Sequence, residues 1–327
     1  MILFVVQDAG PAKYIAYIVQ NLEHECCVIA SNISSNVFDD FSIKYFFDID
    51  ETELKKVKLI VTGTCLNQGI DKEWLLYAKE NNIKSISIIE HWSLYKQRFL
   101  LDEKLVYPDY IFVNDEVARD QALCEGIPEN KLVEVGNPVL ETIKPLQIDT
   151  QIINAWKKSN NIIDENIVLF ISEDFKQDFP KGSDLYQGFD EYSVVDDILK
   201  SLNSKQKLFI KLHPSEKKDK YNYLKSNNVS ILDKTDINCL IASSSYIIGM
   251  GSFLLIEVAL MGRKVYSYRP NQTIDFIGNI IGLTNLVDNK LMLKEVFKNN
   301  IYENMNVNNK FDGSIKKILN FIDGVMK

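Results

Sequence analysis

Short apolar runs alternate with longer amphipathic segments along residues 1–135 of the chain. Runs that are apolar throughout are typical of strands in a parallel sheet that is covered by helices on both faces. The predicted strands are Ile2–Val6, Cys26–Ala30, Leu59–Thr62, Ser85–Ile89, Tyr110–Val113 and Leu132–Val135, and the helices between them include Ala12–Leu22, Lys72–Asn81 and Glu116–Cys124.

The pattern breaks at Gly136-Asn137-Pro138 and then starts again. A second series begins with a polar helix at Thr150–Lys158, continues with strands at Ile167–Ile171, Leu208–Lys211, Val229–Leu232, Tyr246–Gly249 and Lys264–Tyr268, and includes helices at Val194–Leu202 and Phe253–Met261. Two doubly wound α/β halves are therefore predicted, an N-terminal domain of residues 1–145 and a C-terminal domain of residues 146–327. A chain of 327 residues is long enough for two domains.

Composition narrows the classes of function. The net charge is −8, which argues against nucleic acid as a partner. The first residues, Met1–Val6, form too short an apolar run for a signal peptide, and no run of about twenty apolar residues occurs. We therefore expect a cytoplasmic protein, for which peripheral association with the inner face of the membrane remains open.

Polar residues that follow the predicted strands are the candidates for chemistry, because ligands bind at the carboxyl ends of parallel strands. In the first half, Gly10 allows close approach of a ligand to a helix N-terminus. Glu90 and His91 follow a later strand, and the His91 imidazole could accept a proton from an acceptor hydroxyl. Arg98 could meet an anionic group. The alternative for His91 is packing against the wall of the cleft.

The second half carries two stronger candidates. Glu173 and Asp174 follow a strand, where one of the two carboxylates could serve as a base. His213 follows Lys211 at the mouth of another strand, and Pro214 restricts His213 to an extended conformation. A histidine in that position could donate to a phosphate and protonate a leaving group, whereas the alternative is a buried, hydrogen-bonded histidine.

A glycine-rich turn opens the predicted helix that begins at Phe253. Gly251 lets a ligand approach the backbone, Ser252 can cap the helix, and the helix N-terminus attracts phosphate. Glu257 could accept hydrogen bonds from a ribose. Ser244 and Ser245, within the upstream run Ser243–Ser245, add further hydroxyls, although a plain polar turn explains them equally well.

Two segments carry a resemblance to known proteins. KLHP at Lys211–Pro214 and GMGSFLLIEVALMGRKV at Gly249–Val265 resemble the donor-binding half of bacterial GT-B glycosyltransferases. The similarity is greatest to sialyltransferases and polysialyltransferase-like proteins, with Kdo and CDP-glycerol transferases nearby. In bacterial sialyltransferases an acidic motif supplies the base, and an HP motif and a Ser-rich motif hold CMP. The resemblance assigns these roles to Glu173 with Asp174, to His213 with Pro214, and to Ser252 with Ser243–Ser245.

This resemblance implies a GT-B fold, in which two Rossmann-like domains face each other across a cleft. The acceptor would bind residues 1–145 through Gly10, Glu90, His91 and Arg98, and the nucleotide sugar would bind residues 146–327 through Lys211, His213, Pro214, Ser244, Ser245, Gly251, Ser252 and Glu257. The implied reaction moves a sialic-acid-like nonulosonate from its CMP donor to a hydroxyl of a capsule, lipopolysaccharide or glycolipid acceptor. No cofactor beyond this substrate is expected.

Transfer without a metal is expected, because no carboxylate pair with DxD spacing sits at a predicted strand end. The base is open between His91 with Glu90 and Asp174 with Glu173. The acidic motif of the sialyltransferases ends in Gly, whereas Phe175 follows Asp174 here. We favour Asp174 as the base and His91 as a residue that positions the acceptor.

Two other functions are kept as alternatives. Gly136–Glu141 resembles the interdomain segment of non-hydrolysing UDP-N-acetylglucosamine 2-epimerases, so a nucleotide-sugar epimerase or hydrolase is the second hypothesis. The chain lacks that family's Gly-Gly phosphate loop. A third hypothesis is a non-catalytic cytoplasmic protein that binds sugar nucleotides. The sequence makes no prediction about the oligomeric state.

Overall fold

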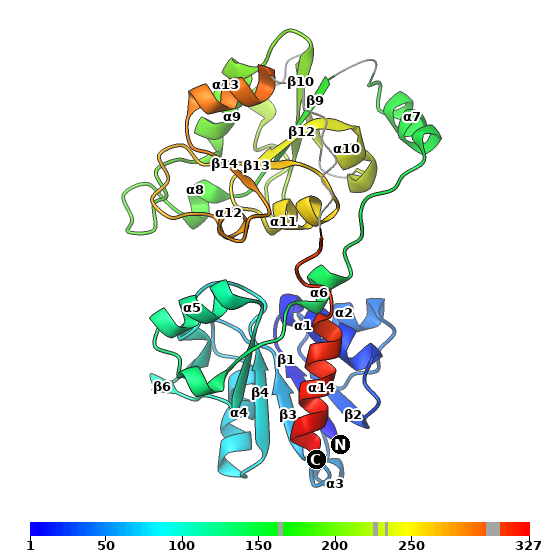
Figure 1. Ribbon diagram of the computed structural model, residues 1–327, viewed down its shortest axis with the longest axis vertical. Helices are drawn as coiled ribbons and strands as arrows, with labels where there is room; N and C mark the ends of the chain where they lie inside the picture. Colours follow the sequence, from blue (N-terminus) through cyan, green and yellow to red (C-terminus); the bar gives the residue numbers. More distant parts are fainter. Residues whose placement is uncertain (163–165, 225–227, 233–234, 299–307) are drawn as a thin grey trace. The chain divides into compact units, whose positions relative to one another are not determined.

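The computed structural model describes residues 1–162, 166–224, 228–232, 235–298 and 308–327 (Figure 1). These residues form two compact units, Met1–Thr142 together with Asn309–Lys327, and Ile143–Asn308. Each unit contains a six-stranded sheet whose strands are all parallel. The predicted α/β fold with two Rossmann-like halves is therefore confirmed.

The first sheet has the strand order β2-β1-β3-β4-β7-β8. Its strands are β1 (Ile2–Val6), β2 (Cys26–Ala30), β3 (Leu59–Thr62), β4 (Lys84–Ile88), β7 (Tyr110–Val113) and β8 (Leu132–Glu134), and a small antiparallel pair is formed by β5 (Leu100–Leu101) and β6 (Lys104–Leu105). The chain order changes direction between β1 and β3, which is the point where doubly wound sheets bind ligands.

Helices cover both faces of this sheet. They are α1 (Ala9–Gln20), α2 (Ser35–Asp40), α3 (Glu51–Leu54), α4 (Ile70–Glu80), α5 (Glu116–Cys124), α6 (Pro138–Glu141) and α14 (Ser314–Met326), with the 3-10 turns η1 (Gln97–Phe99) and η2 (Glu129–Lys131). Alternate residues of β1 enter different cores. Phe4 packs in the core that contains α1 and α14, whereas Leu3 packs in the core that contains Ala78 of α4.

The C-terminal helix α14 belongs to the first unit, whereas the predicted C-terminal domain of residues 146–327 included it. Ile318 and Ile322 are fully buried in the same core as Phe4, and α14 lies beside α1 (Figure 1). Glu141 anchors the start of this helix, because its two carboxylate oxygens accept the backbone N–H groups of Gly313 and Ile315, each at 2.8 Å. An amphipathic pattern predicts that a helix needs a core but not which core it joins.

We expect Glu141→Ala to lower the free energy of unfolding by about 1–2 kcal/mol, because it removes the charged acceptor of two helix N-terminal N–H groups. Urea unfolding followed by circular dichroism measures the change. Glu80→Ala, an exposed glutamate at the end of α4, is the matched control and should change stability by less than about 0.5 kcal/mol. Equal effects of the two substitutions would contradict the anchoring role.

The second sheet has the strand order β11-β10-β9-β12-β13-β14. Its strands are β9 (Asn166–Ile171), β10 (Gln206–Lys211), β11 (Val229–Leu232), β12 (Ser244–Gly249), β13 (Val265–Tyr268) and β14 (Asn285–Val287). Its helices are α7 (Thr150–Ser159), α8 (Phe175–Asp178), α9 (Glu191–Ser201), α10 (Ile237–Ser243), α11 (Phe253–Leu260), α12 (Ile277–Ile280) and α13 (Lys290–Lys298), and η3 (Asn222–Leu224) is a 3-10 turn.

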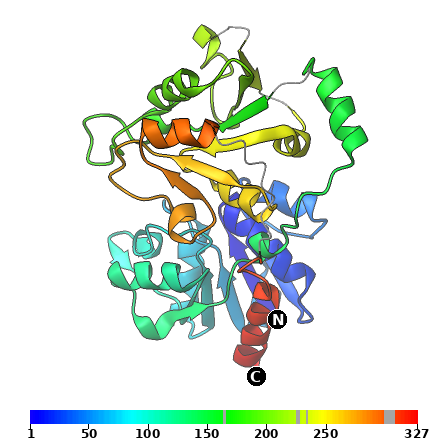
Figure 2. The ribbon, with the colours of Figure 1, turned by 45° about the horizontal axis from the view of Figure 1, so that its top comes forward.

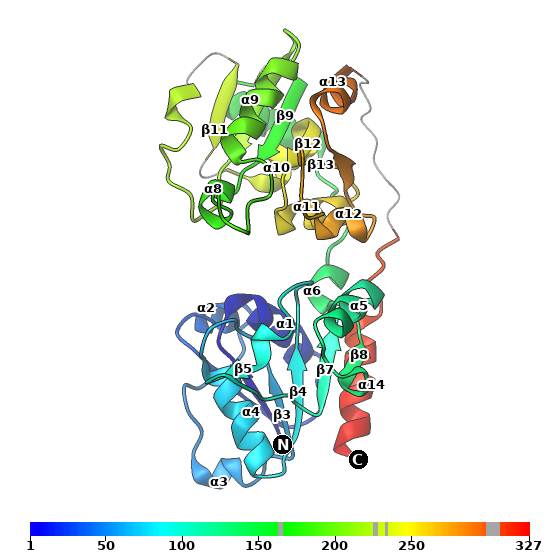
Figure 3. The ribbon, with the colours of Figure 1, turned by 90° about the vertical axis from the view of Figure 1, so that its left-hand side faces the viewer.

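Helices α9 and α13 lie side by side on one face of this sheet, and α10 and α11 contact the other face (Figures 2 and 3). The order of the strands changes direction between β9 and β12, so the carboxyl ends of β9, β10 and β12 meet at one edge. This edge is the predicted position of the nucleotide. No helix in the described part of the chain is long and apolar enough to cross a membrane.

Candidate active site

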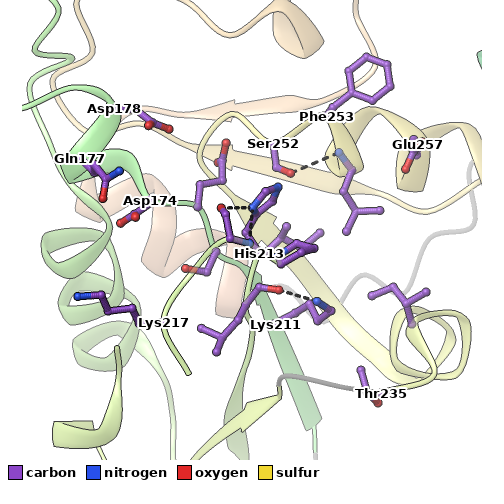
Figure 4. Close-up of a pocket in the computed structure, with 18 residues that line it drawn as sticks. Asp174, Gln177, Asp178, Lys211, His213, Lys217, Thr235, Ser252, Phe253 and Glu257 are labelled. Carbon is purple, nitrogen blue, oxygen red and sulfur yellow. Dashed lines mark hydrogen bonds between the residues drawn. The ribbon is translucent and has the colours of Figure 1, made fainter. Parts of the chain in front are cut away.

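A pocket of about 770 Å³ opens at this edge of the second sheet (Figure 4). Its volume suits a ligand of nucleotide size. Most of the predicted donor and catalytic residues of the second half line it, together with a few further polar groups. They are Glu173 and Asp174 after β9, Lys211, His213, Pro214 and Ser215 at the end of β10, Ser252 at the N-cap of α11, Glu257 within α11, and Gln177, Asp178, Lys217 and Thr235.

His213 is held at the mouth of β10 by its neighbours. Glu216 accepts the backbone N–H of His213 at 2.6 Å. The His213 Nδ1 atom lies 2.6 Å from the Ser215 hydroxyl and accepts the Ser215 backbone N–H at 3.3 Å. Because a backbone N–H can only donate, Nδ1 carries no proton in this arrangement, and the neutral ring has its proton on Nε2. The Nε2–H group is therefore the donor that the ring offers to a ligand.

The N-terminus of α11 holds a carboxylate of the chain itself. Ser252 caps the helix by accepting the Leu254 N–H at 3.4 Å, and Glu173 accepts the Gly251 N–H at 2.8 Å. A phosphate was the ligand predicted for these donors from the sequence. Burial raises the pKa of Glu173 to about 7, although the Gly251 hydrogen bond and the nearby charge of Arg269 act in the opposite direction.

Gly251 is required by the packing behind this turn. A Cβ atom at this position would lie 3.1 Å from a guanidinium nitrogen of Arg269. Arg269 is buried and cannot move away easily, because its guanidinium donates to the Met250 carbonyl at 3.1 Å and to the Gln187 side chain at 2.9 Å. The glycine therefore allows the turn to pack closely against Arg269.

Asp174 lies beside a buried lysine. The Nζ atom of Lys220 is 3.0 Å from Asp174 Oδ1, and the same ammonium contacts Glu191 at 2.5 Å and Glu216 at 2.6 Å. Asp174 remains partly exposed to the pocket, whereas Glu191 and Glu216 are fully buried. The two adjacent carboxylates thus differ in environment, because Glu173 binds a backbone amide and Asp174 forms an ion pair.

Ser244 and Ser245 lie away from the pocket, contrary to the expectation that they bind the donor. They begin β12, and Gly249 ends it, so the strand separates the two serines from the pocket edge by ~15 Å. The Ser244 hydroxyl is buried and donates to the Leu240 carbonyl at 2.7 Å. These serines are part of a buried strand, so the polar-turn alternative does not describe them either.

In the first unit, the predicted acceptor residues lie together at the carboxyl ends of β1 and β4. A Cβ atom on Gly10 would lie 3.1 Å from Glu90 Oε1, and His91 Nε2 is 3.6 Å from the same oxygen. Arg98 is buried and donates to the Thr64 hydroxyl at 3.3 Å. Trp92 is buried as well and donates to Asp115 at 2.8 Å.

The two titratable candidates of the first unit differ in exposure. The His91 side chain is 49% exposed, whereas Glu90 is buried. Partial burial and the charge of Arg98 both lower the pKa of His91, so its ring is neutral at pH 7. Burial raises the pKa of Glu90 to about 7, although Arg98 opposes this change.

Sequence reasoning missed the residues that support His213 and Asp174. Glu216 and Lys220 come from the segment after β10, and Glu191 comes from the start of α9, so the three residues meet only in the folded unit. One signal was present, because Glu216 and Lys220 are four residues apart and Glu216 comes three residues after His213.

Comparisons with solved structures agree with this fold. The chain is similar to UDP-GlcNAc 2-epimerase from Methanocaldococcus jannaschii, with 18% identity, a TM-score of 0.67, and 100% of this chain and 99% of that chain covered. It is also similar to the UDP-GlcNAc 2-epimerase of Neisseria meningitidis bound to UDP-GlcNAc, with 17% identity, a TM-score of 0.64 and 99% of each chain covered. HepE from Anabaena in complex with UDP-glucose shares 12% identity, with a TM-score of 0.68 and coverage of 99% and 98%.

At such low identity these likenesses concern the fold, and they confirm the expected GT-B-like architecture. No curated protein matches the chain at the sequence level. The model of one protein family, described as alpha-2,8-polysialyltransferase, matches residues 9–260, which include His213, Ser252 and the acidic pair. This match covers most of the chain and confirms the resemblance noted in the sequence, so the chain belongs to the alpha-2,8-polysialyltransferase family.

Proposed function

We propose that this chain is a transferase that moves a sialic acid from CMP-sialic acid to a hydroxyl at the end of a polysialic acid glycan. Membership of the alpha-2,8-polysialyltransferase family supports this reaction. The observation that carries the proposal is the convergence of Glu173, His213 and Ser252 on one pocket of nucleotide size. A basic group for the acceptor, a donor for the leaving phosphate and a helix cap are then within one site.

In the proposed reaction the acceptor hydroxyl attacks the anomeric carbon of the donor sugar, and the bond from that carbon to the CMP phosphate breaks. A carboxylate takes the proton of the hydroxyl, and CMP leaves with the electrons of the broken bond. His213 donates its Nε2–H to the leaving phosphate and stabilises the developing charge. We propose that this chemistry proceeds without a metal ion.

We propose Glu173 as the base, in place of the earlier preference for Asp174. A base works best when its pKa is close to the working pH, and burial raises the pKa of Glu173 to about 7. Asp174 is held in an ion pair with Lys220 at 3.0 Å, and protonation of Asp174 would remove the attraction in that pair. Asp174 then serves to position the acidic segment.

The first unit is proposed to bind the acceptor through Gly10, Glu90, His91 and Arg98. Their closeness at the carboxyl ends of β1 and β4 supports this role. His91 is half exposed and Glu90 lies behind it, so His91 can contact a glycan hydroxyl while Glu90 orients the ring. The proposed location is the cytoplasm, with peripheral association at the inner face of the membrane, where such an acceptor would be extended.

A thermal-shift series with CMP, CDP, UDP and GDP tests the proposed donor. CMP at about 100 times its Kd should stabilise the protein by about 2.7 kcal/mol through mass action, and the other nucleotides should act less. Lys211→Met, which alters a pocket residue, should weaken the CMP shift, whereas Ser244→Ala, at the far end of β12, should not. Stabilisation by UDP alone would contradict the proposal and favour the nucleotide-sugar epimerase alternative.

A further inference from the structure

A buried ionic cluster lies beneath the pocket of the second unit. The Lys220 side chain is 5% exposed, and its ammonium contacts carboxylate oxygens of Glu191 at 2.5 Å, Glu216 at 2.6 Å and Asp174 at 3.0 Å. It also donates to the backbone carbonyl of Glu173 at 3.1 Å. Its charge is therefore engaged by three carboxylates, which makes it unsuited to bind the donor phosphate directly.

The cluster joins two segments that leave the sheet at different strands. On the side of β9, Lys220 binds the Glu173 carbonyl and the Asp174 carboxylate. On the side of β10, it binds Glu216 Oε1, and Glu216 Oε2 accepts the His213 backbone N–H at 2.6 Å. One lysine and one glutamate thus form a continuous bridge from the acidic pair to His213.

Ser172 also binds Glu216, a member of the bridge. Its hydroxyl lies 2.8 Å from Glu216 Oε1 and 2.8 Å from the Tyr221 hydroxyl, next to the last residue of β9. Buried ionic clusters contribute little to stability compared with apolar residues of the same size. The position of this cluster is better explained by the geometry that it imposes on Glu173, Asp174 and His213.

We propose that Lys220 and Glu216 are positioning residues that hold Glu173 and Asp174 at a fixed separation from His213. The base and the group that stabilises the leaving phosphate must act on one substrate at the same time, and a shift of about 1 Å between them lowers the rate by about 100-fold. The catalytic meaning of the bridge rests on the proposed function, but its effect on the His213 segment does not.

Lys220→Met and Glu216→Gln test the bridge by different routes. Lys220→Met removes the ammonium. Glu216→Gln keeps the size of the side chain, but whichever way its amide turns, its NH₂ group faces a donor, either the His213 N–H or Lys220 with Ser172. Each variant should lower kcat by about 100-fold, with the KM of the CMP donor changed by less than about three-fold.

The double variant Lys220→Met/Glu216→Gln tests whether the two residues act together or independently. Because both residues act through one bridge, the double variant should lose little more activity than either single variant. Arg263→Met is the matched control, since Arg263 is a buried cation of the same unit that donates to the Ala242 and Ser244 carbonyls, far from the pocket. It should lower Tm as Lys220→Met does and leave kcat near the wild-type value.

A structural readout keeps the test independent of turnover. In the wild-type protein the His213 backbone amide should exchange slowly with solvent, and Lys220→Met and Glu216→Gln should accelerate that exchange by at least about ten-fold. If the wild-type protein transfers no sialic acid, the proposed function fails while the exchange result still supports the bridge. Unprotected exchange of the His213 amide in the wild type would overturn the bridge, as would a kcat within three-fold of wild type in folded Lys220→Met, or fully additive losses in the double variant.

Discussion

His213→Ala should lower kcat for transfer from CMP-sialic acid by about two to four orders of magnitude. The substitution removes the Nε2–H donor. In the wild-type protein the Ser215 backbone N–H donates to Nδ1, so the ring proton is on Nε2. His213→Asn should recover part of the lost binding, because its amide is a neutral donor at a similar position. Initial rates at saturating donor and acceptor, together with CMP affinity from calorimetry, separate the loss of rate from the loss of binding.

Ser215→Ala provides a graded control for this experiment. It removes the hydroxyl that lies 2.6 Å from His213 Nδ1 but leaves the backbone N–H of residue 215 in place, so the same tautomer should persist. We expect a loss of about ten-fold or less, in line with the removal of one neutral hydrogen bond. Turnover by His213→Ala at the wild-type rate would remove His213 from the mechanism.

Glu173→Gln is expected to reduce kcat by about two to four orders of magnitude, with CMP affinity close to that of the wild type. The amide keeps the shape of the side chain but cannot accept the proton of the acceptor hydroxyl. Asp174→Asn should have a smaller effect, because it weakens an ion pair with Lys220 and leaves the base in place. His91→Ala should mainly raise the KM of the acceptor.

The pH dependence of kcat identifies the base independently. Glu173 must be deprotonated to act, so the rate should rise with pH, with a midpoint near the value of about 7 to which burial raises its pKa. If His91 were the base, the rise would occur below pH 6.5, because burial and Arg98 lower the pKa of that ring. A rise in that lower range, abolished in His91→Ala and retained in Glu173→Gln, would exchange the two roles.

The local pattern of the chain was sufficient to locate most strands. β1, β2, β3 and β7 have the predicted bounds, and β4 and β8 differ by one residue. Strands that are apolar throughout are typical of a parallel sheet covered on both faces, so the pattern also predicted the fold class. Because parallel strands place their carboxyl ends at one edge, it further predicted that Glu173, His213 and Ser252 would meet.

The same reasoning failed where a residue lies near a strand but at its other end. Ser244 and Ser245 lie only a few residues before the glycine-rich turn, yet they begin β12, and the opposite end of this strand lies at the pocket edge. The first and last residues of a strand decide which flanking side chains lie at the site. An apolar pattern does not fix those ends when small serines can extend the strand by two residues.

The sequence by itself determined two α/β halves and the edge at which the candidate site lies, because periodicity and strand-end position are local properties. Tertiary structure alone decided three further features. Helix α14 packs in the first unit, where Glu141 binds its N-terminus. Glu173 accepts the Gly251 N–H, which the sequence predicted as a donor to phosphate. Lys220 connects the acidic pair to the segment of His213. Each depends on hydrogen bonds or ion pairs between polar groups that lie far apart in the sequence, and hydrophobic periodicity carries no information about such pairs.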